Sequence, residues 1–289
     1  MVAGLTPQEQ QEIDRANASG RQPVVFVHGL WLLPSSWDLW RVFFEQHGYT
    51  ALAPGWPDDP ETVEEARAHP DVFAKKSLRV IEAHYTEAIR ALDLKPAVIG
   101  HSFGGVITEE LAGKGLSAAS IAIDPAPFRG VISLQASVLK AGAAVLVNPA
   151  NYGRAIALTF EQFNFAWGNA VSEEESRELY ETYHVPGAGR PLFSAAFANV
   201  NPWTEDRVDT TNLDRGPLLL ISGEKDNTVP WASVHAAFER QERNPGITQI
   251  APIENRGHSL TIDSGWREVA EMALAFVQEH APARVASNA

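Results

Sequence analysis

The chain has 289 residues, of which 45% are hydrophobic and 20% charged, and its formal net charge is −13. A chain of this length is near the upper size for a single hydrophobic core, so we expect one domain with a large insertion. Nucleic acids and anionic membranes bind clustered Lys and Arg, and the acidic balance therefore argues against both as partners. The absence of cysteine excludes disulfides, thiolate nucleophiles and Cys-ligated zinc.

The N-terminal stretch "MVAGLTPQEQQEIDRANASG" lacks the basic start and apolar run of a signal peptide. No segment approaches the roughly 18 consecutive apolar residues that a membrane-spanning helix needs. We therefore expect a soluble, cytoplasmic protein. The sequence carries no signal for a particular oligomeric state.

Strand and helix patterns alternate from the start of the chain. Thr6 and Glu9 form a capping box with Pro7 at the first helical position, which predicts a short helix over 7–17. The apolar run "PVVFVHG" (23–29) is typical of a strand buried on both faces of a parallel sheet. The next predicted elements are a helix at 37–48, a strand and turn at 49–57, a mainly irregular loop at 57–70, a helix at 72–93 and a strand at 97–100.

A long interruption divides the second half of this pattern. A helix after Ser102 ends near 112–115, and a fourth strand is predicted at 117–127. Residues 128–215 then look helical and rich in aromatic side chains. The alternation resumes with a strand at 216–223, a helix at 232–243, a strand at 247–254 and a helix at 264–280, followed by a tail that we expect to be frayed.

This order predicts an α/β fold, with a doubly wound, mostly parallel sheet flanked by helices. The expected core consists of residues 1–127 and 216–289. The expected helical cap, 128–215, is inserted between two late strands and covers the carboxyl edge of the sheet.

The stretch "GHSFG" (100–104) fits G-x-S-x-G, the strand-to-helix turn that exposes a nucleophilic serine. A predicted strand precedes it and a predicted helix follows, which is the context that this short motif requires. Gly100 and Gly104 suit positions where strand and helix converge. Strained backbone at Ser102 would be retained only for a function, so we interpret Ser102 as a nucleophile.

A serine needs a base and an acid that orients the base. Of nine histidines, His258 is the best candidate, because "NRGHSLTID" places it on the loop after the last predicted strand. Asp226, on the loop after the 216–223 strand, is the expected acid, since the chain order Ser, Asp, His then matches this motif. Asp124, at the end of "SIAID", is the rival acid.

Acyl transfer also needs N–H donors for the oxyanion of its tetrahedral intermediate. The backbone N–H of Phe103 follows the nucleophile directly, and that of Leu30 lies on the loop after the first strand. Large apolar side chains on that loop and on the cap are expected to line the substrate pocket: Trp31, Leu32, Leu33, Phe163 and Trp167.

The segments "HGLW", "GHSFGG", "GEKDNTVP" and "RGHS" together resemble the α/β-hydrolase superfamily over residues 23–281, and especially its capped esterase and haloperoxidase-like branch. The resemblance implies hydrolysis of small esters or related acyl compounds, with neither cofactor nor metal. Two segments depart from the usual pattern. Few residues precede the first strand, so we expect the usual opening antiparallel pair to be missing or replaced by the helix at 7–17. Residues 53–70 stand where relatives often carry an acidic, Gly-rich loop.

Three functions follow from this interpretation. The first is a serine hydrolase that cleaves a carboxylic ester, with an apolar or aromatic small molecule as the expected substrate. The second uses the same triad on a C–C bond, a lactone or an amide, or for peracid formation. The third is a binding protein that has kept the fold without catalysis.

Overall fold

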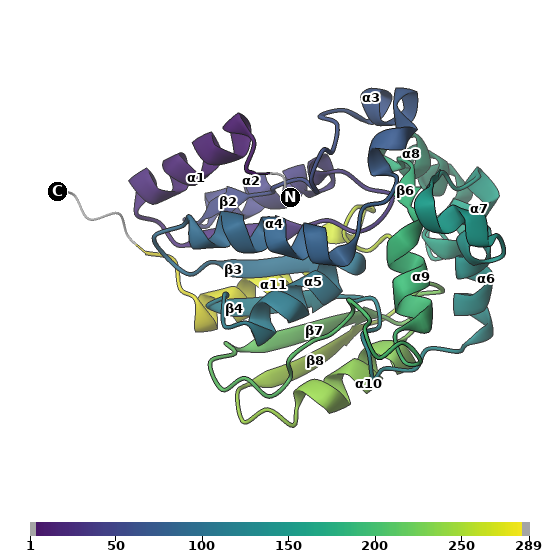
Figure 1. The fold of residues 1–289 in the computed structure, drawn as a ribbon. Coiled ribbons are helices and arrows are strands. Elements are labelled where there is room, and N and C mark those ends of the chain that lie inside the picture. The colour runs from purple at the N-terminus through teal and green to yellow at the C-terminus, as the bar shows by residue number, and fades with distance from the viewer. Residues whose placement is uncertain (1–3, 285–289) are drawn as a thin grey trace.

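The computed structural model describes residues 4–284 and contains a six-stranded sheet in the order β2-β1-β3-β4-β7-β8 (Figure 1). All neighbouring strands in this sheet pair in parallel. The strands are β1 (Pro23–Val27), β2 (Thr50–Leu52), β3 (Ala97–His101), β4 (Ala119–Ile123), β7 (Leu218–Gly223) and β8 (Thr248–Ile253). The doubly wound α/β fold is thus confirmed.

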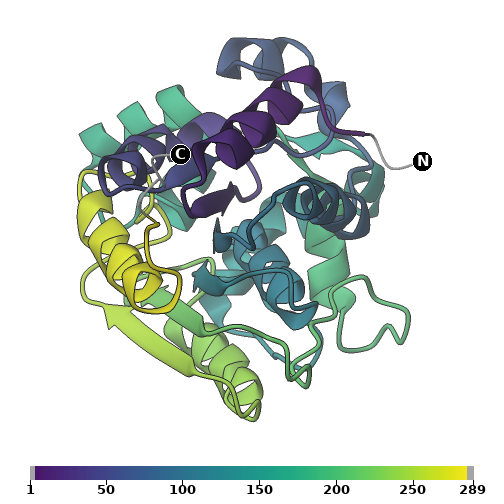
Figure 2. The same cartoon turned by 90° about the vertical axis from the view of Figure 1, so that its left-hand side faces the viewer.

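Helices cover both faces of this sheet. They are α1 (Pro7–Ser19), α2 (Asp38–Gln46), α4 (Leu78–Arg90), α5 (Phe103–Gly113), α10 (Trp231–Gln241) and α11 (Trp266–His280). The short helix α3 (Val63–Ala68) packs apart from the sheet, in a separate small cluster that includes its Ala66. Figure 2 shows α11 on the opposite side of the sheet from α5. Successive side chains of a strand point to opposite faces, so Val25 and Val27 pack in the core under α4 and α5, while Val24 and Phe26 pack in the core under α2 and α11.

The segment 128–215, which we call the inserted segment, connects β4 to β7. Its elements are α6 (Ala136–Leu146), β5 (Ala155–Ile156), α7 (Phe160–Ala166), α8 (Glu173–Tyr183), β6 (Gly187–Ala188) and α9 (Gly189–Phe197). Its helices gather at one end of the molecule, on the side toward which the sheet strands run (Figure 1). The sequence pattern gave no indication of β5 and β6, which form a two-stranded antiparallel pair.

Most predicted elements occur with shorter bounds. The predicted helix at 72–93 begins only at Leu78, because Ser77 is its N-cap and accepts a hydrogen bond from the Val80 N–H. The loop at 57–70 contains the short helix α3, which is capped in the same way by Thr62. Among the described residues, α1 precedes β1 and no strand does, as expected for a chain without the opening antiparallel pair. The predicted frayed tail includes residues 285–289, which lie outside the described residues.

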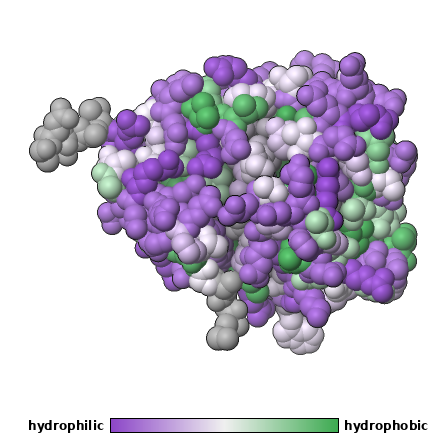
Figure 3. Space-filling model, turned by 90° about the horizontal axis from the view of Figure 1, so that it is seen from above, coloured by the Kyte–Doolittle hydropathy of each residue, from purple (hydrophilic) through white to green (hydrophobic). Residues whose placement is uncertain are grey.

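The surface over α1 and α3 is mainly hydrophilic, with apolar side chains in small groups (Figure 3). No helix within residues 4–284 combines the length and apolar character needed to cross a membrane.

The order of the strands in the sheet indicates where a ligand-binding site is expected. The chain moves from β1 outward to β2 and then returns to β3, so the loops after β1 and β3 diverge and leave a crevice where ligands of such sheets bind.

Candidate active site

Ser102 lies at this crevice, between the end of β3 and the start of α5. Its backbone has φ +56° and ψ −119°, a region that residues other than glycine rarely adopt. A Cβ on Gly100 would lie 2.1 Å from the Gly104 carbonyl oxygen, and a Cβ on Gly104 would lie 2.0 Å from the Val27 carbonyl oxygen. Strand and helix are therefore too close for side chains at either glycine, and the tight turn presents the serine at the strand end.

Ser102, His258 and Asp226 come together from three loops. His258 Nε2 lies 3.0 Å from Ser102 Oγ, and His258 Nδ1 lies 2.5 Å from Asp226 Oδ2. The second oxygen, Asp226 Oδ1, accepts the N–H groups of Thr228 at 2.6 Å and Val229 at 2.9 Å. A carboxylate only accepts hydrogen bonds, so Nδ1 carries the proton and Nε2 is available to receive one from the serine.

The rival acid, Asp124, is also buried beside this group, but the side chain bonded to His258 Nδ1 is that of Asp226. Asp124 Oδ1 accepts the Gly223 N–H at 2.9 Å. Burial, together with the neighbouring Asp226 carboxyl, raises the pKa of Asp124 well above its usual range. The structure thus places Asp226, and not Asp124, in the position of the orienting acid.

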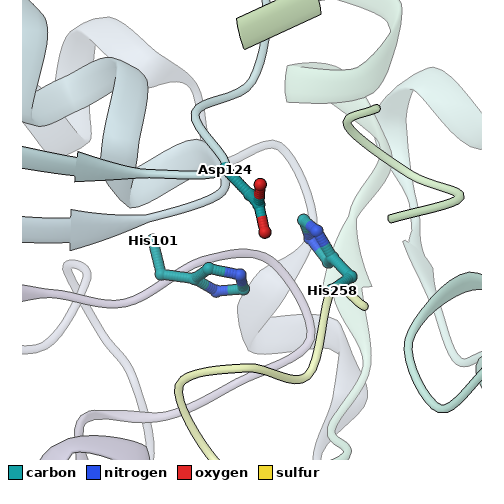
Figure 4. Close-up of side chains that lie close together, drawn as sticks. All are labelled: His101, Asp124 and His258. Atoms are coloured by element: carbon teal, nitrogen blue, oxygen red, sulfur yellow. The ribbon is translucent and has the colours of Figure 1, made fainter. Parts of the chain in front are cut away.

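The side chains of Asp124, His101 and His258 point toward one another (Figure 4). Each offers a potential metal ligand, and these atoms lie within 4.8 Å of one another. However, both His258 nitrogens already face hydrogen-bond partners in Asp226 and Ser102. A cation bound by His258 would break one of these contacts, so we assign no metal to the group. Burial and the nearby His258 lower the pKa of His101 well below its usual range, and His101 is therefore a neutral ring beside the histidine.

Two backbone N–H groups are free at the predicted oxyanion positions. Within residues 4–284, neither the Leu30 nor the Phe103 N–H has a hydrogen-bond acceptor. The Gly29 carbonyl, which shares a peptide plane with the Leu30 N–H, accepts a hydrogen bond from His28 Nδ1 at 2.9 Å. Because the peptide unit is planar and trans, holding this carbonyl on one side fixes the N–H on the other.

The sequence interpretation missed three residues around His28. Asp59 Oδ2 lies 3.0 Å from His28 Nε2, and Asp59 Oδ1 forms a buried ion pair with Lys76. The Trp56 ring stacks on the His28 ring at 4.9 Å, and the backbone N–H of Trp56 donates to Asp59 Oδ2 at 2.9 Å. Burial opposes the ionisation of Asp59, but His28 and Lys76 outweigh it and lower its pKa. The available signal was the acidic pair in "GWPDDP", directly after the second strand.

The inserted segment contacts the loops that carry the acid and the histidine. Thr228 Oγ1 donates to the Ala166 carbonyl at 2.7 Å, and Asn227 Nδ2 donates to the Phe165 carbonyl at 2.9 Å. The Ser259 N–H donates to the Trp167 carbonyl at 3.3 Å. These bonds meet the last turn of α7, where carbonyl groups lack intrahelical partners.

Four of the five predicted pocket residues share one buried cluster with Leu30 and Phe103: Trp31, Leu32, Phe163 and Trp167. The Trp167 ring meets the His258 ring edge to face at 4.6 Å, and Phe163 stacks on Trp167 at 5.8 Å. Trp31 Nε1 donates to the Ile156 carbonyl at 2.9 Å, which links the loop after β1 to the inserted segment. Leu33 does not join this group, because it packs in a separate small cluster with Ala66, Phe73 and Val185.

Known proteins resemble this chain in sequence and in fold. The sequence profile described as the Alpha/beta hydrolase family matches residues 24–272, and the chain therefore belongs to the α/β hydrolase family. A stretch of 86 residues is 37% identical to the non-heme chloroperoxidase of Burkholderia pyrrocinia. This match spans 29% of the present chain and only 28% of that protein.

Solved structures extend the likeness over most of the fold. The monoacylglycerol lipase of Paleococcus ferrophilus has a TM-score of 0.62 at 18% identity, covering 91% of this chain and 98% of that one. An extracellular α/β-hydrolase from a Paenibacillus species has a TM-score of 0.64 at 18% identity, with 88% and 98% covered. A putative non-heme bromoperoxidase from Mycobacterium tuberculosis H37Rv has a TM-score of 0.64 at 15% identity, with 89% and 92% covered. At these identities the likeness concerns the fold alone.

Proposed function

We propose that the protein hydrolyses a carboxylic ester through an acyl-enzyme formed on Ser102. The observation that carries this proposal is the chain of contacts from Ser102 Oγ through the His258 ring to the Asp226 carboxylate, at 3.0 Å and 2.5 Å. Membership of the α/β hydrolase family supports hydrolysis as the type of reaction. The ester is the simplest acyl substrate for a serine nucleophile with a histidine base.

In the first half-reaction, Ser102 Oγ attacks the ester carbonyl carbon while its proton passes to His258 Nε2. The carbonyl oxygen becomes an oxyanion, which the Leu30 and Phe103 N–H groups stabilise. His258 then gives the proton to the leaving alcohol as the carbon–oxygen bond breaks. A water molecule, deprotonated in turn by His258, attacks the acyl-enzyme, and the carboxylic acid leaves with Ser102 restored.

His28 and Asp59 support the oxyanion site in this proposal. A donor aimed at the developing charge is worth about 2.7–4 kcal/mol of transition-state stabilisation, provided that it does not have to reorient. The hydrogen bond from His28 to the Gly29 carbonyl meets this condition for the Leu30 N–H. The ion pair of Asp59 with Lys76 holds His28 in turn.

The inserted segment serves as a cap in this proposal. Ser102 is only 5% exposed, and Trp167 covers the His258 ring. An apolar or aromatic small-molecule ester would suit the surrounding side chains, because its affinity would come from apolar surface buried against them. The cap would also exclude bulk water from the oxyanion site, where a hydrogen bond is then stronger.

The test is Ser102→Ala, assayed with a short-chain p-nitrophenyl ester. Loss of the nucleophile should lower kcat by about a millionfold, and a fluorophosphonate probe should label the wild type but not the variant. Near-normal turnover by Ser102→Ala would end the proposal. A wild type that neither turns over esters nor reacts with the probe would favour a binding protein that has kept the fold.

The partial match to a non-heme chloroperoxidase supports one second candidate, peracid formation. The acyl group on Ser102 would then pass to hydrogen peroxide instead of water, so that a carboxylic acid and hydrogen peroxide give a peracid and water. No electron transfer to the protein is involved. Peracid formed from a short carboxylic acid and peroxide by the wild type, and lost in Ser102→Ala, would establish this activity.

A further inference from the structure

The triad holds a second buried carboxyl group that the proposed mechanism does not use. Asp124 directly follows β4, and both it and Asp226 are buried, at 0% and 3% exposure. Asp226 is hydrogen-bonded to the His258 ring, a side-chain oxygen of Asp124 lies within 4.8 Å of a nitrogen of that ring, and burial, followed by the neighbouring Asp226 carboxyl, raises the pKa of Asp124. Asp124 also has φ +39°, an unusual conformation for a residue other than glycine. Such a backbone at a strand end suggests that the side chain is placed for a purpose.

The two acids cannot both be ionised in this position. Two like charges in contact repel strongly when water is excluded, so a buried pair of carboxyl groups retains one proton. Asp226 already accepts three hydrogen bonds, from His258 Nδ1 and from the Thr228 and Val229 N–H groups, as an ionised carboxylate does. Each of these donors favours the charge on Asp226. The shared proton therefore resides on Asp124.

The unpaired oxygen of Asp124 supports the same assignment. Its Oδ1 accepts the Gly223 N–H, whereas its Oδ2 has no hydrogen-bond partner among the described residues. Burial and the Asp226 carboxyl raise the pKa of Asp124 by more than the neighbouring Ser222 hydroxyl lowers it. A protonated Oδ2 needs an acceptor, and the Asp226 carboxylate supplies one. The other titratable groups facing Asp124 are the His258 and His101 rings, which point toward it from the loop after β8 and from the end of β3 (Figure 4).

From this geometry, and resting on the proposed function, we propose that Asp124 is a positioning residue. As a neutral carboxylic acid it donates a hydrogen bond to the Asp226 carboxylate and holds that carboxylate against His258. The Gly223 N–H orients Asp124 at the point where β7 ends and the loop carrying Asp226 begins. The single negative charge, on Asp226, then stabilises the His258 imidazolium. The Asp226 carboxylate is held in place by Asp124 on one side and by His258 on the other.

The pair of variants Asp124→Asn and Asp124→Ala separates a neutral donor from a charge. An Asn side chain can donate to Asp226 through its N–H and accept from Gly223 through its oxygen, so kcat should stay within a few-fold of the wild type. Ala removes a hydrogen bond to a buried charge, and kcat should fall by about 10- to 100-fold with little change in KM. The same loss in both variants would overturn the proposal.

The pH profile gives a readout that a merely structural role would not move. Without the donor in Asp124→Ala, the Asp226 carboxylate becomes more basic and favours the imidazolium, so the acidic limb of kcat/KM should move to higher pH. Asp124→Asn should leave that limb in place. If Asp124 were ionised in the wild type, Asp124→Asn would remove a negative charge beside His258, and the limb would move to lower pH instead.

Infrared difference spectra test the protonation state without catalysis. Between the wild type and Asp124→Asn at neutral pH, the band that disappears should be that of a protonated carboxyl group; loss of a carboxylate band would overturn the proposal. Glu109→Gln is the matched control, since it exchanges another buried acid for its amide away from the triad and should leave kcat/KM unchanged. If the wild type shows no Ser102-dependent ester hydrolysis, the proposed function fails while this spectrum still decides the state of Asp124.

Discussion

Helix α5 contacts two buried polar clusters that differ in how their atoms are paired. At its N-terminus, the Ser102 hydroxyl, both His258 nitrogens and both Asp226 oxygens have directed partners. In its middle, Glu109 Oε1 accepts from Gln241 Nε2 at 2.9 Å, while Oε2 has no partner within the described residues. Burial raises the pKa of Glu109 to about 8, although Gln241 acts in the opposite direction.

This difference in hydrogen bonding shows that an acid buried in the same core can either keep its charge or keep its proton. A carboxylate with several directed donors can keep its charge and orient a neighbour, because its hydrogen bonds replace those of water. A carboxyl group with few donors keeps its proton instead and lowers stability wherever it must ionise. The well-paired carboxylate can take part in catalysis, whereas the poorly paired carboxyl group affects only the free energy of unfolding.

The largest expected effect tests the paired cluster. Asp226→Asn keeps the size of the side chain but removes the charge that fixes the histidine tautomer, so kcat should fall by about 10⁴-fold. The measurement is kcat for a p-nitrophenyl ester, with thermal unfolding to check that the fold persists. Asn227→Ala, on the same loop, is the control and should retain most of the activity. An Asp226→Asn enzyme within tenfold of the wild type would show that this acid does not orient His258.

The second prediction concerns the unpaired cluster. The ordinary pKa of a glutamate is 4.5, and that of folded Glu109 is about 8. Below pH 4.5 the group is protonated in both states; as pH rises toward 8 the unfolded chain ionises first, and stability is lost across that window. Glu109→Gln should remove this loss and raise the free energy of unfolding by a few kcal/mol at the alkaline end.

Urea unfolding at a series of pH values measures this difference. Glu87→Gln, on the exposed surface of α4, is the matched control and should follow the wild type at every pH. Parallel curves for the wild type and Glu109→Gln between pH 4.5 and 8 would contradict the prediction and would mean that the middle of α5 is as well paired as its N-terminus.

Sequence patterns predicted the fold well because every strand of this sheet except the edge strand β8 is buried on both faces. The runs "PVVFV" and "LLLISG" are apolar throughout, and Gly100 and Gly104 mark the convergence of strand and helix in local sequence. The order of Ser102, Asp226 and His258 likewise depends on which strand each residue follows. These features are local, and a single sequence therefore carries them.

Features that depend on contacts between distant segments were not predictable. Asp59 and Lys76 are separated by 17 positions and reach His28 only because the loop after β2 folds back over the loop after β1. The strand β5 is two residues long, too short for a periodic pattern to reveal it. Leu33 looked like a pocket residue beside Trp31, but the turn of the chain directs it to another cluster.

The third prediction concerns the oxyanion site, where Asp59 acts on the Leu30 N–H only indirectly, through His28 and the Gly29 carbonyl. Asp59→Asn keeps the shape of the side chain but weakens its hold on His28 and Lys76, so the Gly29–Leu30 peptide is less firmly fixed. We expect kcat to fall by about tenfold with little change in KM, which is part of the effect of losing an oxyanion donor. Inhibition by a boronic acid, which forms a tetrahedral adduct on serine, should weaken in parallel.

Asp58→Asn is the control for that experiment, because it removes a neighbouring charge without touching the His28 contact. A fall in kcat without weaker boronic acid binding would contradict the assignment of His28 and Asp59 to the oxyanion site. It would indicate that Asp59 acts on the fold of the loop alone. Equal kcat and equal boronic acid binding in Asp59→Asn and Asp58→Asn would likewise contradict this assignment.

The smallest expected effect lies where the inserted segment meets the acid loop. Thr228→Val keeps the branched shape but leaves the Ala166 carbonyl, which now accepts at 2.7 Å, without this donor. Because one neutral hydrogen bond is lost and the Asp226 carboxylate keeps its backbone donors, we expect about 1 kcal/mol lower stability and nearly unchanged kcat. Urea unfolding measures the first and ester turnover the second, with the exposed Thr182→Val of α8 as control. A large fall in kcat would mean that the contact with α7, rather than the backbone donors, orients Asp226. The good pairing of the cluster at the N-terminus of α5, which the Glu109 cluster lacks, would then depend on the inserted segment.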